Sequence, residues 1–124
     1  MYKVGMQKKF IAAHHLLGEA SPEEKVKHSH HYCVDVEFSG YSLDSQGYLL
    51  NIDHLDIMMK EVLAKFKNAY LNELPEFENC NPSLEHFARI LADGFSVHHD
   101  ANLVHIKVLL WEDDIAWASY EKAL

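Results

Sequence analysis

Residues 28–38 read His-Ser-His-His-Tyr-Cys-Val-Asp-Val-Glu-Phe, and their alternation is the clearest structural signal in the chain. Side chains two residues apart on a β-strand share a face. The even-numbered face starts with His28 and His30 and continues into apolar residues, whereas the odd-numbered face is mostly polar. The pattern therefore predicts a strand whose even-numbered face is directed toward a core.

Residues 3–16 alternate more loosely and predict a neighbouring strand. The loop-like residues 18–27 would connect the two strands as an antiparallel ribbon. The apolar face of this neighbouring strand would carry Val4, Met6, Phe10, Ala12 and His14.

Apolar residues at helical spacing predict two helices in the middle of the chain. After a short extended piece at 48–51, Asp53 would cap a helix that runs to about residue 69. The second helix would begin at Asn81-Pro82, with proline at the first helical position, and end near residue 95.

Two further strands are expected at 102–111 and 115–121, joined by a turn at Glu112-Asp113-Asp114. The resulting order, ββααββ, is typical of an α+β domain whose helices lie on one face of an antiparallel sheet.

Composition excludes several classes of protein. The 124 residues fit one domain, 1–124. The sequence has neither an apolar run of about 18 residues nor an apolar N-terminal segment, so we expect no membrane span or secretory signal. A net charge of −8 without a basic cluster argues against nucleic-acid binding. Cys33 and Cys80 form no C-x-x-C, which indicates a reducing, cytoplasmic setting rather than a disulfide framework.

The chain has ten histidines, many for its length, and strand parity brings three of them together. His28 and His30 share a strand face, and His14 lies on the apolar face of the neighbouring strand, so their imidazoles can converge. Three imidazoles with an open fourth position are typical of a catalytic zinc site. His15 and His31 have the opposite parity and should point away. The five others are interpreted as surface or interface residues rather than metal ligands: His54, His86, His98, His99 and His105. For His98 and His99, which lie in an expected loop, both readings stay open.

Several motifs resemble the 6-pyruvoyl-tetrahydropterin synthase and 6-carboxy-tetrahydropterin synthase family. Phe10-Ile11-Ala12-Ala13-His14 is similar to its F-x-A-A-H, and His28-Ser29-His30-His31-Tyr32 is similar to its H-G-H-x-[FY]. Further matches follow in order: residues 48–53 resemble G-x-[VI]-x-D-F, Tyr70-Leu71-Asn72 resembles Y-L-N, Asn81-Pro82-Ser83-Leu84-Glu85 resembles N-P-T-x-E, and Glu112 resembles the pterin-anchoring glutamate.

This resemblance implies a T-fold, in which a four-stranded antiparallel sheet carries two helices. Family subunits assemble into a barrel-forming homotrimer, commonly stacked as a homohexamer, with active sites between subunits. The resemblance also implies Zn²⁺ on His14, His28 and His30, the set that strand parity selects. Glu112 would bind the amino group and ring N–H of a pterin substrate, and zinc would act as a Lewis acid on its C6 side chain.

The sequence departs from the family at its catalytic positions. The family's cysteine, four residues before H-x-H, is replaced by Glu24, and the parity of Cys33 prevents it from substituting. The family's Asp–His proton relay falls on Lys67-Asn68. Lys67 is either a solvated helix lysine or a replacement for the relay, and Glu24, with its neighbour Glu23, is either a general base or a solvated loop charge.

Together with these residues, the resemblance implies a zinc-dependent pterin lyase that acts on the side chain of 7,8-dihydroneopterin triphosphate. A family subgroup with glutamate near the cysteine position gives 6-hydroxymethyl-dihydropterin, which points to that product with Glu24 as base. The alternatives are 6-carboxy-5,6,7,8-tetrahydropterin synthesis in the queuosine and deazapurine pathway, a pterin-binding paralogue without turnover, and a purely structural zinc ion.

Overall fold

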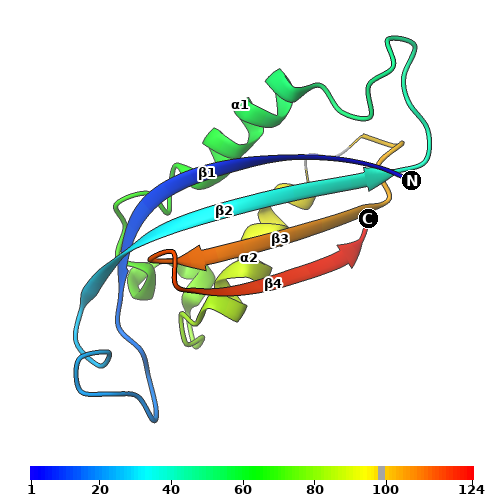
Figure 1. Cartoon of the computed structure of the whole chain (residues 1–124). Coiled ribbons are helices and arrows are strands. Elements are labelled where there is room, and N and C mark those ends of the chain that lie inside the picture. The colour runs from blue at the N-terminus through cyan, green and yellow to red at the C-terminus, as the bar shows by residue number, and fades with distance from the viewer. Residues whose placement is uncertain (98–99) are drawn as a thin grey trace.

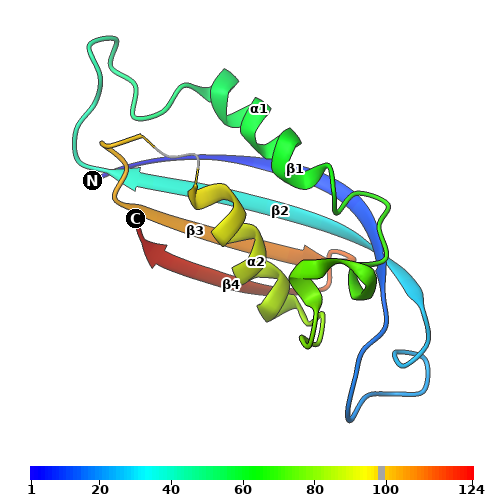
Figure 2. The same cartoon turned by 180° about the vertical axis from the view of Figure 1, so that it is seen from behind.

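The computed structural model describes residues 1–97 and 100–124. Four strands form one antiparallel sheet in the order β1-β2-β3-β4: β1 Tyr2–His14, β2 His28–Gly40, β3 His105–Glu112 and β4 Ala116–Ala123. Helices α1 (Ile52–Leu63) and α2 (Leu84–Ser96) cover one face of this sheet, as Figures 1 and 2 show from opposite sides. The predicted class, element order and placement of the helices are confirmed.

The core lies between the helices and the even-numbered face of the sheet. The predicted apolar residues of β2 and β3 on this face are at most 1% exposed: Val34, Val36, Phe38, Ile106, Val108 and Leu110. On α2, the fully buried Phe87 packs its ring at centroid distances of 5.3 to 5.9 Å against those of Phe10, Tyr32, Phe66 and Phe77. Aromatic packing therefore joins α2 and the segment between the two helices to the first two strands.

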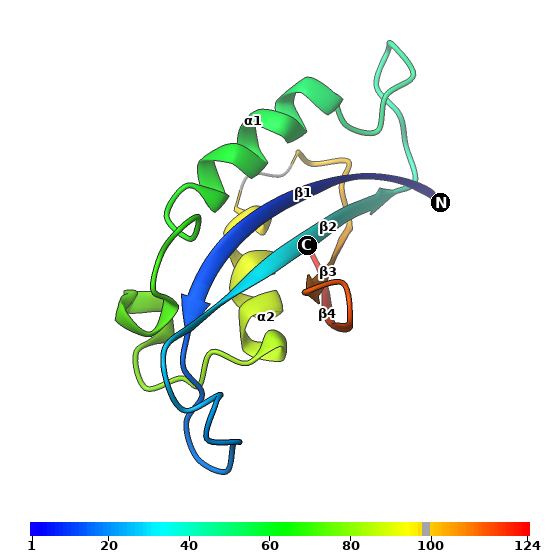
Figure 3. The same cartoon turned by 60° about the vertical axis from the view of Figure 1, so that its left-hand side comes forward.

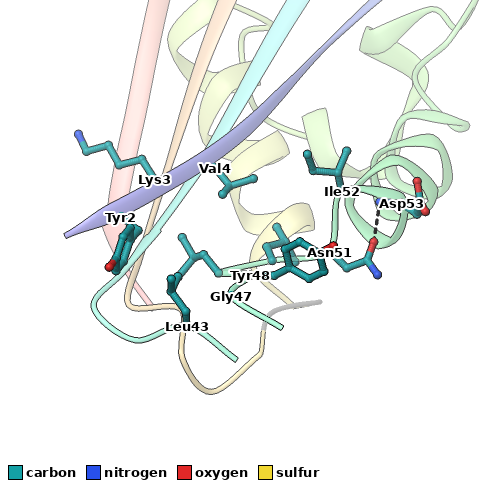
Figure 4. A pocket seen from close by; sticks show the side chains of 11 residues that line it. Tyr2, Lys3, Val4, Leu43, Gly47, Tyr48, Asn51, Ile52 and Asp53 are labelled. Carbon is teal, nitrogen blue, oxygen red and sulfur yellow. Dashed lines mark hydrogen bonds between the residues drawn. The ribbon is translucent and has the colours of Figure 1, made fainter. Parts of the chain in front are cut away.

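The first helix begins and ends earlier than predicted. Its N-cap is Asn51 rather than Asp53, because the Asn51 side chain accepts a hydrogen bond of 2.8 Å from the Asp53 N–H (Figure 4). The helix ends at Leu63 instead of near residue 69, and residues 68–69 lie along the edge of β1. The Asn68 N–H donates to the Ile11 carbonyl, and Asn68 has a φ of 60°. This backbone conformation is incompatible with a continuing helix.

Other boundaries also differ from the sequence prediction. Helix α2 is capped by Ser83, whose hydroxyl accepts from the His86 N–H at 3.2 Å, so Pro82 is not its first residue. The extended piece expected at 48–51 is a series of bends. Strand β3 begins at His105 because residues 100–103 turn, with the Leu103 N–H bonded to the Asp100 carbonyl.

Strands β1 and β2 pair along their whole length, from Tyr2 opposite Gly40 to His14 opposite His28. Their connection, residues 15–27, projects beyond the end of the sheet, and both chain termini lie toward the opposite end (Figures 1 and 3). Among the described residues, no helix is long and apolar enough to cross a membrane.

Replacing Phe87 with alanine should lower the free energy of unfolding by about 3–5 kcal/mol, because it opens a cavity among four aromatic rings. Urea denaturation followed by circular dichroism measures this loss. The control, Ile115→Ala, truncates a side chain that is 83% exposed and should change stability by about 0.5 kcal/mol or less. Equal losses in the two variants would contradict the proposed core.

Candidate metal centre

The end of β1 and the start of β2 bring three imidazoles together. The strand register puts His14 opposite His28 and Ala12 opposite His30, so the three rings share the helix-facing side of the sheet. Their centroids are 4.6 to 4.9 Å apart, and one nitrogen from each lies within 4.8 Å of the others. The predicted convergence of His14, His28 and His30 is therefore present in the structure.

The spacing of these nitrogens fits a small tetrahedral ion. The Nε2 atoms of His14 and His28 are 3.0 Å apart. Two nitrogens bound to zinc at tetrahedral geometry would be about 3.3 Å apart, given Zn–N bonds of about 2.0–2.1 Å. Only a small adjustment would therefore bring this pair to the separation that zinc requires.

The outer nitrogens of the three rings already have partners. His28 Nδ1 donates to the Val26 carbonyl at 2.7 Å, and His30 Nδ1 donates to the Asp113 carboxylate. His14 Nδ1 lies 3.2 Å from the Tyr32 hydroxyl. Because carbonyls and carboxylates only accept, Nδ1 of His28 and of His30 carries a proton, and in the neutral rings the Nε2 lone pairs face the cluster, as metal ligation requires.

Burial keeps the central imidazole neutral. His14 is 2% exposed, and its pKa falls from 6.5 to about 4, first through desolvation and then through the nearby His30 and His28. A hydrogen bond to the Pro82 carbonyl opposes this shift. A neutral ring is the form that binds a metal ion.

Two acidic side chains border the cluster at the start of the β3–β4 turn. Glu112 Oε1 is 3.3 Å from His30 Nε2, and Asp113 contacts the same ring through Nδ1. Burial raises the pKa of Glu112, and the charges of Asp113 and Glu24 raise it further, against the opposing effect of His30. The predicted substrate anchor therefore lies beside the three histidines.

The candidate base lies in the β1–β2 connection. Glu24 is exposed, and its carbonyl accepts a hydrogen bond of 2.7 Å from the Leu16 N–H. Its charge helps to raise the pKa of Glu112, so the two carboxylates lie within electrostatic range of one another. Its neighbour Glu23 is also exposed.

Two alternative catalytic groups lie elsewhere. Cys33 is on the opposite face of β2, and desolvation and the charge of Asp35 raise the pKa of its thiol, which disfavours the nucleophilic thiolate. Lys67 is exposed and borders a cavity of about 400 Å³ that also contains Cys33 and excludes the three clustered histidines.

The remaining histidines within the described residues make separate contacts. His15 Nδ1 is 2.6 Å from the Tyr70 hydroxyl, His86 Nδ1 is 2.6 Å from the Asn81 carbonyl, and His105 is 3.5 Å from Glu121. His31 and His54 are exposed. His98 and His99 lie outside the described residues.

Sequence reasoning assigned no role to two asparagines that support the site. The Asn72 side chain bonds to both the N–H and the carbonyl of His15, at 2.9 and 3.0 Å. The Asn81 side chain accepts from the Leu17 N–H at 2.8 Å. Both asparagines belong to the Y-L-N and N-P-T-x-E motifs, and the fold shows that they fix the backbone directly after His14.

A second cavity lies at the far end of β1, roughly 40 Å along the strand from His14. It measures about 460 Å³ and is bordered by Tyr2, Leu43, Tyr48 and the cap of α1 (Figure 4). None of the predicted site residues borders it.

A model of the 6-pyruvoyl tetrahydropterin synthase family matches residues 3–123. The chain belongs to this family. Similar family proteins include two that are provisionally named 6-carboxy-5,6,7,8-tetrahydropterin synthase. The Archaeoglobus fulgidus protein is 28% identical, with 96% of this chain and 95% of the relative covered. The Pyrococcus horikoshii protein is 25% identical, with 94% and 87% covered.

Solved structures confirm the family fold. The Caenorhabditis elegans 6-pyruvoyl tetrahydropterin synthase superposes with a TM-score of 0.77 at 20% identity and covers 98% of this chain and 97% of its own. A Plasmodium vivax 6-pyruvoyltetrahydropterin synthase gives a TM-score of 0.79 at 12% identity, covering 99% and 98%. That protein was solved with cysteine or alanine in place of a glutamate described as a catalytic residue.

The metal-free protein should lose stability as the pH falls from about 6.5 to about 4. His14 has a lower pKa folded than unfolded, so the unfolded chain binds more protons in this window, and acidification favours unfolding. Protonation of His14 should lower the free energy of unfolding by about 3 kcal/mol near pH 4, relative to neutral pH. Urea unfolding in a chelator at pH 7 and pH 4.5 measures it.

His14→Gln should flatten this pH dependence, whereas His54→Gln, at an exposed position, should leave it unchanged. If both variants keep the wild-type dependence, His14 does not carry the effect.

Proposed function

We propose that the chain is a zinc-dependent lyase of the 6-pyruvoyl tetrahydropterin synthase family, acting on the side chain of 7,8-dihydroneopterin triphosphate, with 6-carboxy-5,6,7,8-tetrahydropterin as product. The main support is the convergence of three imidazoles beside a half-buried glutamate. The names of the two archaeal relatives support this product.

In this proposal His14, His28 and His30 hold the zinc ion. When bound, zinc would polarise the hydroxyls of the pterin side chain and ease loss of their protons. Three histidines leave a position for substrate, unlike the closed four-ligand pattern of a structural zinc site.

Two carboxylates would have separate roles, Glu112 in substrate binding and Glu24 in proton transfer. Glu112 would accept hydrogen bonds from the amino group and ring N–H of the pterin, because a carboxylate matches such a donor pair in a bidentate manner. Glu24 would take a proton from the side chain onto a carboxylate oxygen. The exposed loop position of Glu24 gives it access to a substrate that enters from solvent.

A second product is favoured by one observation. Glu24 aligns with the family's cysteine and its charge reaches Glu112, and the Plasmodium vivax protein likewise has a glutamate described as catalytic. This supports cleavage to 6-hydroxymethyl-dihydropterin as the second candidate reaction.

We also propose that copies assemble as a homotrimer or homohexamer with sites between subunits. Within the described residues, the outer edge of β4 and the first part of the β1 edge carry no further strand. Such edges can pair with another copy.

The zinc-loaded protein should convert 7,8-dihydroneopterin triphosphate to 6-carboxy-5,6,7,8-tetrahydropterin, identified by mass spectrometry against standards. Formation of 6-hydroxymethyl-dihydropterin alone would favour the second candidate. Pterin binding without any product would instead identify a non-catalytic paralogue.

Glu24→Gln should lower kcat about 10²–10⁴-fold, because it removes the proton acceptor, while pterin affinity stays unchanged. Glu23→Gln is the matched control in the same loop and should retain activity. Full activity of Glu24→Gln would exclude Glu24 as the base.

Glu112→Gln should weaken pterin binding about 10–100-fold, because it replaces a charged acceptor by a neutral amide. Fluorescence titration with a non-reacting pterin measures the affinity. Zinc content should be unaffected, and a loss of zinc with unchanged pterin affinity would make Glu112 a ligand rather than an anchor.

A further inference from the structure

Asp113 is held in a tight turn at the rim of the histidine cluster. It follows Glu112, the last residue of β3, and precedes Asp114 in the connection to β4. Asp113 and Asp114 have φ angles of 52° and 57°, both left-handed, in the three-residue connection between the paired residues Glu112 and Ala116. Aspartate and asparagine are the non-glycine residues that adopt this conformation most readily.

Three hydrogen bonds tie Asp113 to β2. Its backbone N–H donates to the His31 carbonyl at 2.7 Å, and its Oδ1 accepts from the His31 N–H at 2.9 Å. Its Oδ2 accepts from His30 Nδ1. The carboxylate is therefore fixed from two sides, and its position follows that of the β2 backbone.

The contact with His30 determines the state of that ring. Because a carboxylate only accepts, His30 must carry a proton on Nδ1, and in the neutral ring this leaves the Nε2 lone pair free. His30 Nε2 is buried and has no hydrogen-bond partner among the described residues, although Glu112 lies 3.3 Å away. A buried lone pair of this kind calls for a hydrogen-bond donor or a metal ion as its partner.

The three imidazoles differ in the partner of their Nδ1 atom. His28 is oriented by a neutral backbone carbonyl and His14 contacts a tyrosine hydroxyl, whereas His30 has a carboxylate. A carboxylate behind a ligating imidazole fixes its tautomer and orientation and raises its basicity. Loss of that charge should therefore weaken metal binding.

We propose that Asp113 is a positioning residue that holds His30 in the tautomer and orientation needed for metal binding. This inference rests on the metal site proposed above. Asp113 does not touch the substrate in this role, since it acts through His30.

Asp113→Asn should reduce zinc affinity about 10–100-fold, measured by competition with a chromophoric chelator on the full chain. Asparagine retains the turn conformation, but its amide cannot accept from both His30 and His31 through two oxygens. Asp114→Asn is the matched control, because it changes the same charge in the neighbouring turn residue, and its zinc affinity should equal that of the wild type.

Two further readouts separate positioning from a purely structural role. The melting temperature of metal-free Asp113→Asn should remain close to that of Asp114→Asn. Nitrogen-15 NMR of the metal-free wild type should show His30 protonated at Nδ1, and a predominant Nε2–H tautomer would overturn the proposal even if the variant fails to fold.

The outcomes also distinguish this inference from the proposed function. If the wild type binds zinc and both variants bind it equally well, Asp113 has no positioning role and the metal site stands. If the wild type does not bind zinc, the metal site and this inference both fail.

Discussion

The pairing register of β1 with β2 is the constraint on which the site depends. It aligns His14 with His28 and places His30 opposite Ala12, so that all three rings face the helices. A shift of one residue would turn every side chain of one strand to the other face of the sheet. The apolar residues further along both strands oppose such a shift, because it would expose them to water. Core packing thus maintains the geometry of the histidine cluster.

The parts of this structure that strand alternation controls could be predicted from the sequence. Alternation located both strands and their shared face, and it selected the three clustered histidines. The end of α1 could not be predicted in this way, because Phe66 continues the helical spacing while Asn68 bonds to Ile11 on a distant strand. The contact between Asp113 and His30 could not be predicted from the sequence either, because the two residues are 83 positions apart along the chain and only the fold brings them together.

The polar surroundings of the cluster form two layers with different origins. Asn72 and Asn81 come from the segment between the helices and fix the backbone that follows His14. Tyr32 on β2 and Asp113 in the β3–β4 turn contact the rings of His14 and His30 themselves. The backbone after His14 and the outer nitrogens of these two rings are therefore both restrained, which limits the reorganisation needed to bind an ion.

The segment that follows α1 also determines how the edge of the sheet can be used. The Ile11 carbonyl and the Ala13 N–H are already bonded to residues 68–69, and the His15 N–H is bonded to Asn72. At the β1 edge, a strand from another molecule can therefore extend the sheet only along the earlier part of the strand, up to about Lys9. A seam between copies at this edge must stop short of His14, which would leave that end of the β1 edge accessible to a small molecule.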